Sequence, residues 1–183
     1  MSEQHRRDWD RRIDEALRTC VGQTIVEVTV EEMGLYGPDE APTFSHPALP
    51  FIQVGTLELA LAGGGLLHIK IFQDNDQFAL WAEHVESGQR IGSREQSTLY
   101  RIRQVDGFPL GEIEAVEGRR DERGDYQEIR ITVGGKPVIV KAGEVYEDHD
   151  GTLKVLERDE SVLIFLDPAA YDGFQFNVPV GRI

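Results

Sequence analysis

The chain contains a single cysteine, Cys20, among its 183 residues. One cysteine excludes an intramolecular disulfide and a zinc site built from several cysteines. No window approaches the roughly 18 apolar residues that a membrane span requires. Residues 1–20 interleave acidic residues with arginines and lack the apolar run of a secretory signal. These absences predict a water-soluble protein of the cytoplasm that does not bind a membrane.

Basic residues are also scarce. The 19 lysines and arginines stand against 33 acidic residues, so the formal net charge is −14 with histidine taken as neutral. Nucleic acids are polyanions that such a chain repels, which excludes them as partners. The excess is concentrated in residues 106–172, which contain 17 acidic and 8 basic residues. A basic protein is therefore the class of partner that this composition favours.

Motifs that carry catalytic or metal-binding chemistry are missing. The histidines at positions 5, 46, 68, 84 and 149 have no ligand spacing such as HxxxH. The glycines of "AGGGLL" do not lead into a helix, and no Lys-Ser/Thr pair completes a phosphate loop. Hydrolase, kinase and dinucleotide fingerprints are absent as well. Carboxylate pairs are too abundant to indicate a hydrolase, so the sequence predicts no cofactor, no metal and no catalytic residue.

Four apolar residues near the N-terminus have the spacing of a helix. Trp9, Ile13, Leu17 and Cys20 recur at intervals of four, four and three residues, with charged residues between them. This pattern predicts an amphipathic helix over about residues 6–20 that packs through its apolar stripe. Cys20 lies on the stripe, so it is interpreted as a small buried hydrophobe rather than a nucleophile.

After Gly22 the sequence consists of short runs typical of strands, interrupted by a proline-rich stretch at residues 33–50 that is interpreted as a loop. "TIVEVTVEE" alternates valines with polar residues, and "LLHIKIF" places His68 on a polar face predicted to be wet. "VLIFL" is continuously apolar, as expected of a strand covered on both faces. We therefore predict a single α+β, mainly β domain, residues 1–183, with the helix packed on roughly ten antiparallel strands, the last at "FQFNV".

Two long segments of the predicted β-structure are similar to each other. Residues 57–81 and residues 128–157 both run strand, glycine turn, strand, acidic turn, strand. The distance from the preceding glycine to the matched segment is longer in the first copy than in the second. The proline-rich loop, inserted into the first copy, accounts for this difference. The pattern indicates a duplicated β-unit, with copies at about residues 21–86 and 109–167.

Acidic residues gather at the corresponding turn of each unit, in "FQDNDQ" and "YEDHDG". Asp, Asn and Gly suit tight turns, so a solvated turn is the simplest interpretation. Neighbouring side chains on extended backbone point to opposite faces, and the ligand order of a calcium loop is absent, which disfavours a metal site. Our hypothesis is a contact surface for a basic partner. It comprises Asp74, Asp76, Asp148, His149, Asp150, Asp159 and Glu160.

Three stretches within residues 108–168, "FPLGEIEAV", "VIVKAGEVYED" and "RDESVLIFLDP", resemble bacterial proteins that are found beside polymorphic toxins and act as immunity proteins. The resemblance implies a non-catalytic protein that binds and neutralises a cognate toxin, but it supplies no contact residues. Enzymes that act on polyanions are basic, which agrees with an acidic inhibitor. The alternative is an enzyme or small-ligand-binding module with its site between the two β-units. Oligomeric state and stoichiometry stay open.

Overall fold

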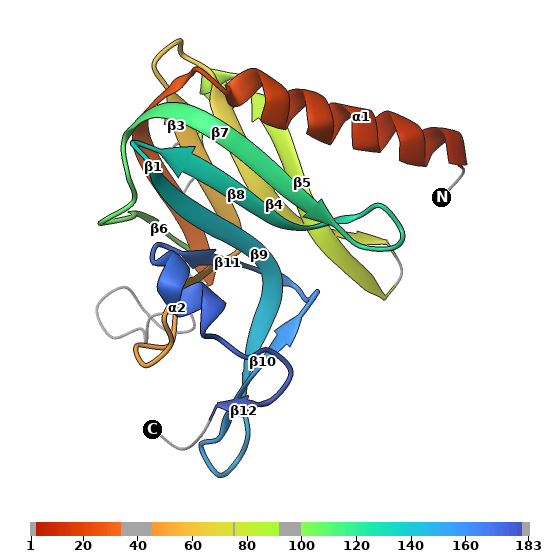
Figure 1. The fold of residues 1–183 in the computed structure, drawn as a ribbon, viewed down its shortest axis with the longest axis vertical. Helices are drawn as coiled ribbons and strands as arrows, with labels where there is room; N and C mark the ends of the chain where they lie inside the picture. Colours follow the sequence, from red (N-terminus) through yellow and green to blue (C-terminus); the bar gives the residue numbers. More distant parts are fainter. Residues whose placement is uncertain (1–2, 34–44, 75, 92–99, 181–183) are drawn as a thin grey trace.

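The computed structural model describes residues 3–33, 45–74, 76–91 and 100–180. Helix α1 (Glu3–Cys20) precedes a β-rich body, and this confirms the mainly β fold class (Figure 1). The strands are β1 (Thr24–Met33), β2 (Ile52–Val54), β3 (Thr56–Leu61), β4 (Leu66–Asp74), β5 (Gln77–Val85), β6 (Tyr100–Gln104), β7 (Gly111–Arg120), β8 (Tyr126–Val133), β9 (Lys136–Glu147), β10 (Leu153–Glu157), β11 (Ser161–Phe165) and β12 (Pro179–Val180). The short helices are η1 (Ser87–Gln89) and α2 (Pro168–Asp172).

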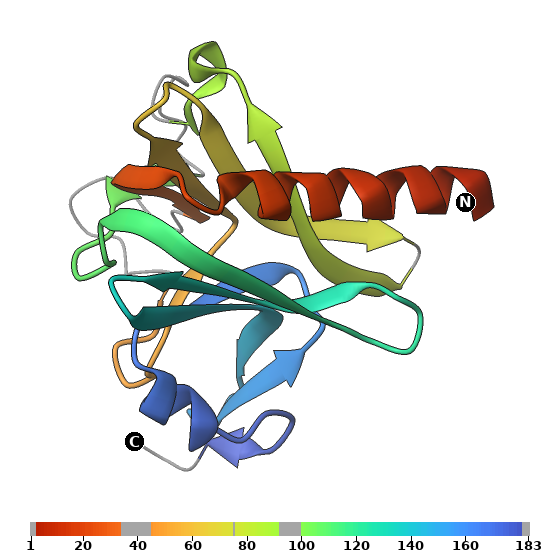
Figure 2. The same cartoon turned by 45° about the horizontal axis from the view of Figure 1, so that its top comes forward.

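The strands form one antiparallel sheet. Its main path runs β12-β10-β9-β8-β7-β1-β3-β4-β5, while β6 adds to β1 and β11 pairs with both β9 and β2. The sheet bends so that β5 packs against β8 and β9 (Figure 2). One hydrophobic core fills the space between its two halves. Among the described residues, neither α-helix is long and apolar enough to cross a membrane.

Helix α1 packs on the sheet through the stripe that the sequence predicts. Ile13 and Leu17 are almost fully buried, Cys20 is fully buried, and the Trp9 ring lies 4.7 Å from the ring of Trp81 on β5. Burial raises the pKa of the Cys20 thiol to about 11, so the thiol stays protonated at neutral pH. The helix begins three residues earlier than predicted and ends at the same residue.

The two similar segments have the same strand order. Strands β3, β4 and β5 form one antiparallel meander, and strands β8, β9 and β10 form another. The halves join where Thr24 and Ile25 of β1 pair with Glu112 and Gly111 of β7. This order is what a duplication requires, although equivalence of the two units residue by residue stays a prediction.

Two details of the strand predictions are wrong. The alternation in β1 shifts at a bulge between Ile25 and Glu27, so that Ile25 is buried and Val26 is 51% exposed. Glu32 lies on the same face as Val28 and Val30, and it is fully buried and pairs with Arg101 of β6. A bulge adds one residue to a strand and thereby exchanges its faces. "FQFNV" is not a strand; its Phe174 and Phe176 instead pack onto β9 and β11, and pairing resumes only at β12.

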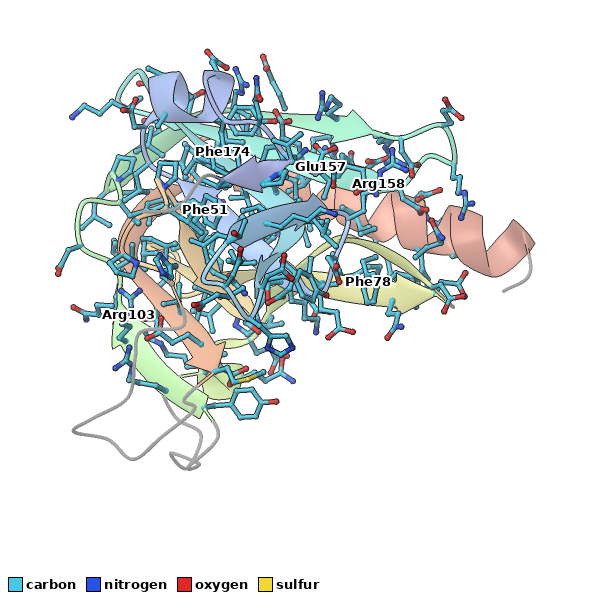
Figure 3. The ribbon with its side chains drawn as sticks, turned by 90° about the horizontal axis from the view of Figure 1, so that it is seen from below. Phe51, Phe78, Arg103, Glu157, Arg158 and Phe174 are labelled. Carbon is cyan, nitrogen blue, oxygen red and sulfur yellow. The ribbon has the colours of Figure 1, made fainter. Side chains whose placement is uncertain are left out.

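A second, smaller core lies on the other side of β9 and β11. Val162 and Ile164 of β11 belong to the main core, whereas Leu163 and Phe165 belong to the second core, which confirms that this strand is covered on both faces. The second core is aromatic, and its Phe51 and Phe174 rings lie 5.5 Å apart (Figure 3). It anchors α2 and the segment after it to the sheet.

Candidate functional site

The β9–β10 hairpin extends to the end of the molecule opposite α1 (Figure 1). Its turn is closed by a hydrogen bond from Asp148 N to Thr152 O of 2.9 Å, and Asp150 Oδ1 accepts from Thr152 N at 3.0 Å. Gly151 has a φ of 80°, a conformation that favours glycine. Asp148, His149 and Asp150 are all exposed. The turn interpretation therefore describes how this stretch folds, and it leaves the side chains accessible.

We call residues 144–160 the acidic arm. This stretch contains seven acidic and two basic residues. Glu157 is neutralised by the buried Lys141, whose Nζ lies 2.7 Å from Glu157 Oε1. Arg158 pairs with Asp121 at 3.4 Å, outside the arm. The arm thus keeps a negative charge over the hairpin and the residues that follow it.

At the base of the hairpin a group of six side chains, the Glu144 cluster, joins β2, β9 and β11. Glu144 Oε1 accepts a 2.5 Å hydrogen bond from Gln53 Nε2, and Glu144 Oε2 accepts from Ser161 Oγ. The hydroxyl of Tyr146 donates to Asp159 Oδ2 at 3.1 Å. The cluster comprises Gln53, Glu144, Tyr146, Asp159, Glu160 and Ser161.

The electrostatics of this cluster are those of crowded carboxylates. Burial raises the pKa of Glu144 above its ordinary value, and the charges of Asp159 and Glu160 raise it further, against the opposing hydrogen bonds from Ser161 and Gln53. Burial, together with Asp159, raises the pKa of the Tyr146 phenol to about 12, so this hydroxyl remains a donor at neutral pH. Placing a positive charge here would relieve both effects.

The structure separates the sequence-predicted contact residues into two places. Asp148, His149, Asp150, Asp159 and Glu160 all belong to the acidic arm, with Asp159 half-buried and the other four exposed. The remaining two residues lie at the β4–β5 turn, which Figure 1 shows well away from the β9–β10 turn. These two are Asp74, which is half-buried, and Asp76, which is exposed. The two acidic turns therefore do not form one continuous face.

Sequence reasoning missed four members of the Glu144 cluster, and one of them, Tyr146, lies two residues before the predicted acidic turn. Ser161 directly follows the acidic pair Asp159 and Glu160, which is a signal for its position but not for its contact. Glu144 lies in a strand that pairs with both β10 and β11, and the β9–β11 register brings it to Ser161 by placing Ser161 opposite Gly143. Gln53 is 91 residues away from Glu144 in the chain, and nothing in the sequence around it indicates a buried polar contact.

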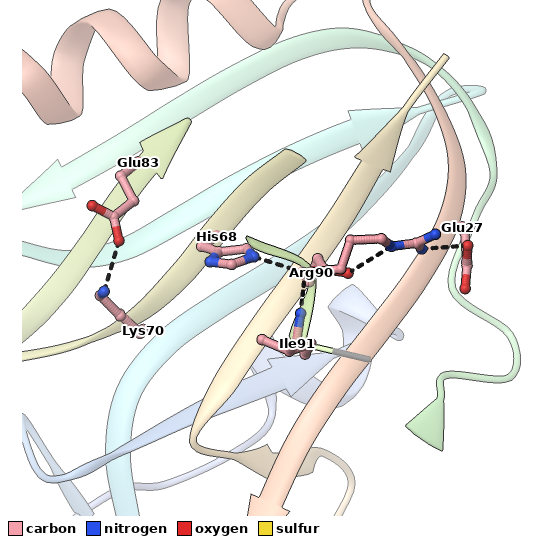
Figure 4. Close-up of polar contacts among 7 residues, drawn as sticks. Glu27, His68, Lys70, Glu83, Arg90 and Ile91 are labelled. Atoms are coloured by element: carbon pink, nitrogen blue, oxygen red, sulfur yellow. Dashed lines mark hydrogen bonds and ion pairs between the residues drawn. The ribbon is translucent and has the colours of Figure 1, made fainter. Parts of the chain in front are cut away.

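A second polar cluster lies on the face of β3 and β4 that the sequence predicts to be wet, and this prediction is wrong. His68 is 4% exposed, and its Nε2 lies 2.7 Å from Oε2 of Glu58, which is 1% exposed (Figure 4). The segment after β5 covers this face: Ile91 N donates to Glu58 Oε2 at 2.8 Å, and Arg90 reaches both Glu58 and Glu27. The alternation is right, but the polar face is covered, so this cluster holds the fold together.

A groove with a volume of about 380 Å³ lies between α1 and β5. His84 Nε2 contacts Ala16 O at 3.0 Å and Thr19 Oγ1 at 2.7 Å. A carbonyl oxygen only accepts, so Nε2 carries the proton and is not the base of a nucleophilic Thr-His pair. The residues that line this groove include Arg12, Glu15, Thr19, Trp81, Glu83 and His84.

Within the described ranges, no group of three or more His, Cys, Asp or Glu side chains is arranged to hold a metal ion. Comparison with known protein families, with curated proteins and with solved structures finds no match for this chain.

Proposed function

We propose that this protein is a non-catalytic binding protein that neutralises a basic protein, namely a toxin enzyme of a bacterial polymorphic toxin system, inside the cytoplasm. The observation that supports this proposal best is the acidic arm, an accessible hairpin in which acidic residues outnumber basic ones by seven to two. Folding alone does not require this charge, because the turn needs only a glycine and an Asx side chain that bonds the backbone.

Exposed carboxylates suit such a role energetically. Each one changes the free energy of unfolding little, because water and salt screen its repulsion. The summed negative field, however, attracts a positively charged surface over a distance of about a Debye length. It raises the association rate above the roughly 10⁵–10⁶ M⁻¹s⁻¹ of an uncharged pair. Rapid capture is what an inhibitor of a toxic enzyme requires.

The experiment is co-expression of the chain with the product of the reading frame adjacent to its gene. We expect that product to arrest growth alone, to be tolerated with this chain, and to form a complex measurable by stopped-flow fluorescence. The variant D148N/D150N keeps the turn, since an Asn oxygen can still accept from Thr152 N. It should associate more slowly, with a flatter salt dependence. Growth arrest that persists with the wild-type chain, without complex formation, would overturn the proposal.

A matched control removes two charges elsewhere. E112Q/E117Q changes two exposed glutamates on β7, away from the arm, and should leave the association rate near that of the wild type. D74N/D76N tests whether the other predicted turn contributes to binding. If D148N/D150N associates at the wild-type rate at low salt, the acidic arm is not part of the interface. A large loss of stability would mean that the turn binds a structural ligand.

A further inference from the structure

The Glu144 cluster contains a buried acceptor that lacks a donor. Gln53 is 2% exposed, and its Nε2 faces Glu144 Oε1 at 2.5 Å and Ser161 Oγ at 3.3 Å. Its Oε1 is one of two buried side-chain oxygens in the described residues with no hydrogen-bond partner. The other belongs to Gln127, whose amide faces the backbone of Phe78 and no carboxylate. A buried carbonyl oxygen without a donor is costly and calls for an explanation.

The carboxylates beside Gln53 also lack a cation, unlike the buried glutamates of this protein. Glu32 is fully buried and pairs with both Arg101 and Arg103. Glu58 is almost fully buried and pairs with Arg90. The ion pairs of the described residues include none for Glu144. Glu128, the third buried glutamate, pairs with Arg119 and Arg130. The fold therefore supplies a guanidinium to each buried glutamate and only neutral donors to the half-buried Glu144.

The other acidic and aromatic members of the Glu144 cluster are groups that bind a cation. Asp159 and Glu160 add two carboxylates, and neither has an ion pair within the described ranges. Lys154 lies across from Tyr146 in the β9–β10 ladder. Within the described residues, it makes no ion pair with Asp159 or Glu160. Tyr146 is 46% exposed, and the bond from its hydroxyl to Asp159 holds its ring beside the carboxylates. An aromatic face next to carboxylates is the environment in which arginine stacks and forms forked hydrogen bonds.

We propose that the Glu144 cluster receives an arginine side chain of the partner. Its guanidinium stacks on Tyr146 and donates to Glu144 and Asp159, and the fifth N–H remains for Gln53 Oε1. Arginine fits better than lysine because it presents five donors in a plane, whereas an ammonium group is a compact charge with three. The identity of the partner rests on the function proposed above, but the chemistry of the subsite does not.

A small probe tests the subsite without the partner. N-acetyl-arginine amide is titrated into ¹⁵N-labelled protein at low ionic strength. We expect saturable shifts at the Gln53 side-chain amide and at the backbone amides of Tyr146 and Ser161. E144Q should weaken this binding about tenfold, as expected for the loss of a charge-assisted hydrogen bond. E112Q removes the same charge from an exposed position on β7 and should leave the binding unchanged.

A second variant and a second probe make the result decisive. Y146A removes the stacking ring at a half-exposed position and should also weaken the binding of the arginine probe, even if E144Q folds poorly. N-acetyl-lysine amide should bind several-fold more weakly than the arginine probe. Equal binding of the two probes, or shifts that do not saturate and spread over all acidic residues, would overturn the assignment.

The subsite and the proposed function can fail separately. If E144Q neutralises the toxin with unchanged affinity, the subsite is not part of the interface although the function stands. If the arginine probe binds as expected and no basic toxin is bound, the subsite stands and the proposed function falls.

Discussion

The half-buried Glu144 differs from the buried glutamates of this protein in how its charge is compensated. Glu32 and Glu58 are each bound by guanidinium groups, whereas Glu144 receives hydrogen bonds only from the neutral side chains of Gln53 and Ser161. An ionised carboxylate that is half-buried and close to other acidic residues carries a free-energy cost. A residue that costs stability in the free protein and would gain a partner in a complex has the character of a binding residue.

E144Q should therefore stabilise the free protein at neutral pH. Burial raises the folded-state pKa of Glu144 above its ordinary value of 4.5, so the native state holds this proton more tightly than the unfolded chain does. The free energy of unfolding then falls as pH rises from about 4.5 through the folded-state pKa. Thermal melts should give E144Q the higher Tm at pH 7, by about 2–4 °C for each kcal/mol gained, and the difference should vanish in acid.

The exposed Glu147, on the same strand, provides the control for this measurement. E147Q should change the free energy of unfolding by no more than about 0.5 kcal/mol, as is usual for a surface substitution. If E144Q has a lower Tm than the wild type at pH 7, the carboxylate serves mainly as an acceptor for Gln53 and Ser161. Its role would then be structural.

At the scale of elements, the most informative feature is the segment from η1 to Ile91 that covers the polar face of β3 and β4. It is attached through Glu58, which binds the Ile91 amide, the Arg90 guanidinium and the His68 ring together. The segment is short and has little regular structure. These polar contacts and the burial of Ile91 therefore account for its position.

E58Q should loosen this segment and destabilise the protein by about 1.5–3 kcal/mol, the range for hydrogen bonds to charged groups. Hydrogen exchange at the Ile91 amide should accelerate more than exchange in the core strands. E83Q is the control, because Glu83 pairs with Lys70 at 2.6 Å with both side chains about a third or more exposed. Such a pair contributes only about 0–1 kcal/mol. Equal effects of the two substitutions would show that burial of Glu58 is unimportant.

The whole molecule carries a net charge of −14, so long-range repulsion acts on the free protein. Raising the ionic strength from about 0.01 M to about 0.15 M shortens the Debye length from about 30 Å to about 8 Å. The Tm of the free protein should therefore rise with salt, while association with a basic partner should slow. Thermal melts across one salt series test the expected rise in Tm, and stopped-flow measurements across the same series test the expected slowing of association. A Tm that falls with salt would show that internal ion pairs outweigh the repulsion.

Local patterns in the sequence determine the elements of this protein. The helical stripe of Ile13 and Leu17, the glycine turns between strands and the continuous apolar run of β11 each depend on neighbours in the chain, and the structure confirms all three. The failures within strands have one physical cause. Alternation shows which residues share a face of a strand, but it shows neither where a bulge exchanges the faces nor what covers them.

Only the tertiary structure decided the environment of the charged groups. His68 is buried because a segment remote from β3 covers its polar face. Glu144 meets Gln53 because β11 pairs with both β9 and β2 and so brings Gln53 near β9. The acidic turns lie apart because the meanders they close occupy different halves of the sheet. Charge, turn chemistry and periodicity are properties of local sequence, whereas burial and pairing depend on which distant segments meet.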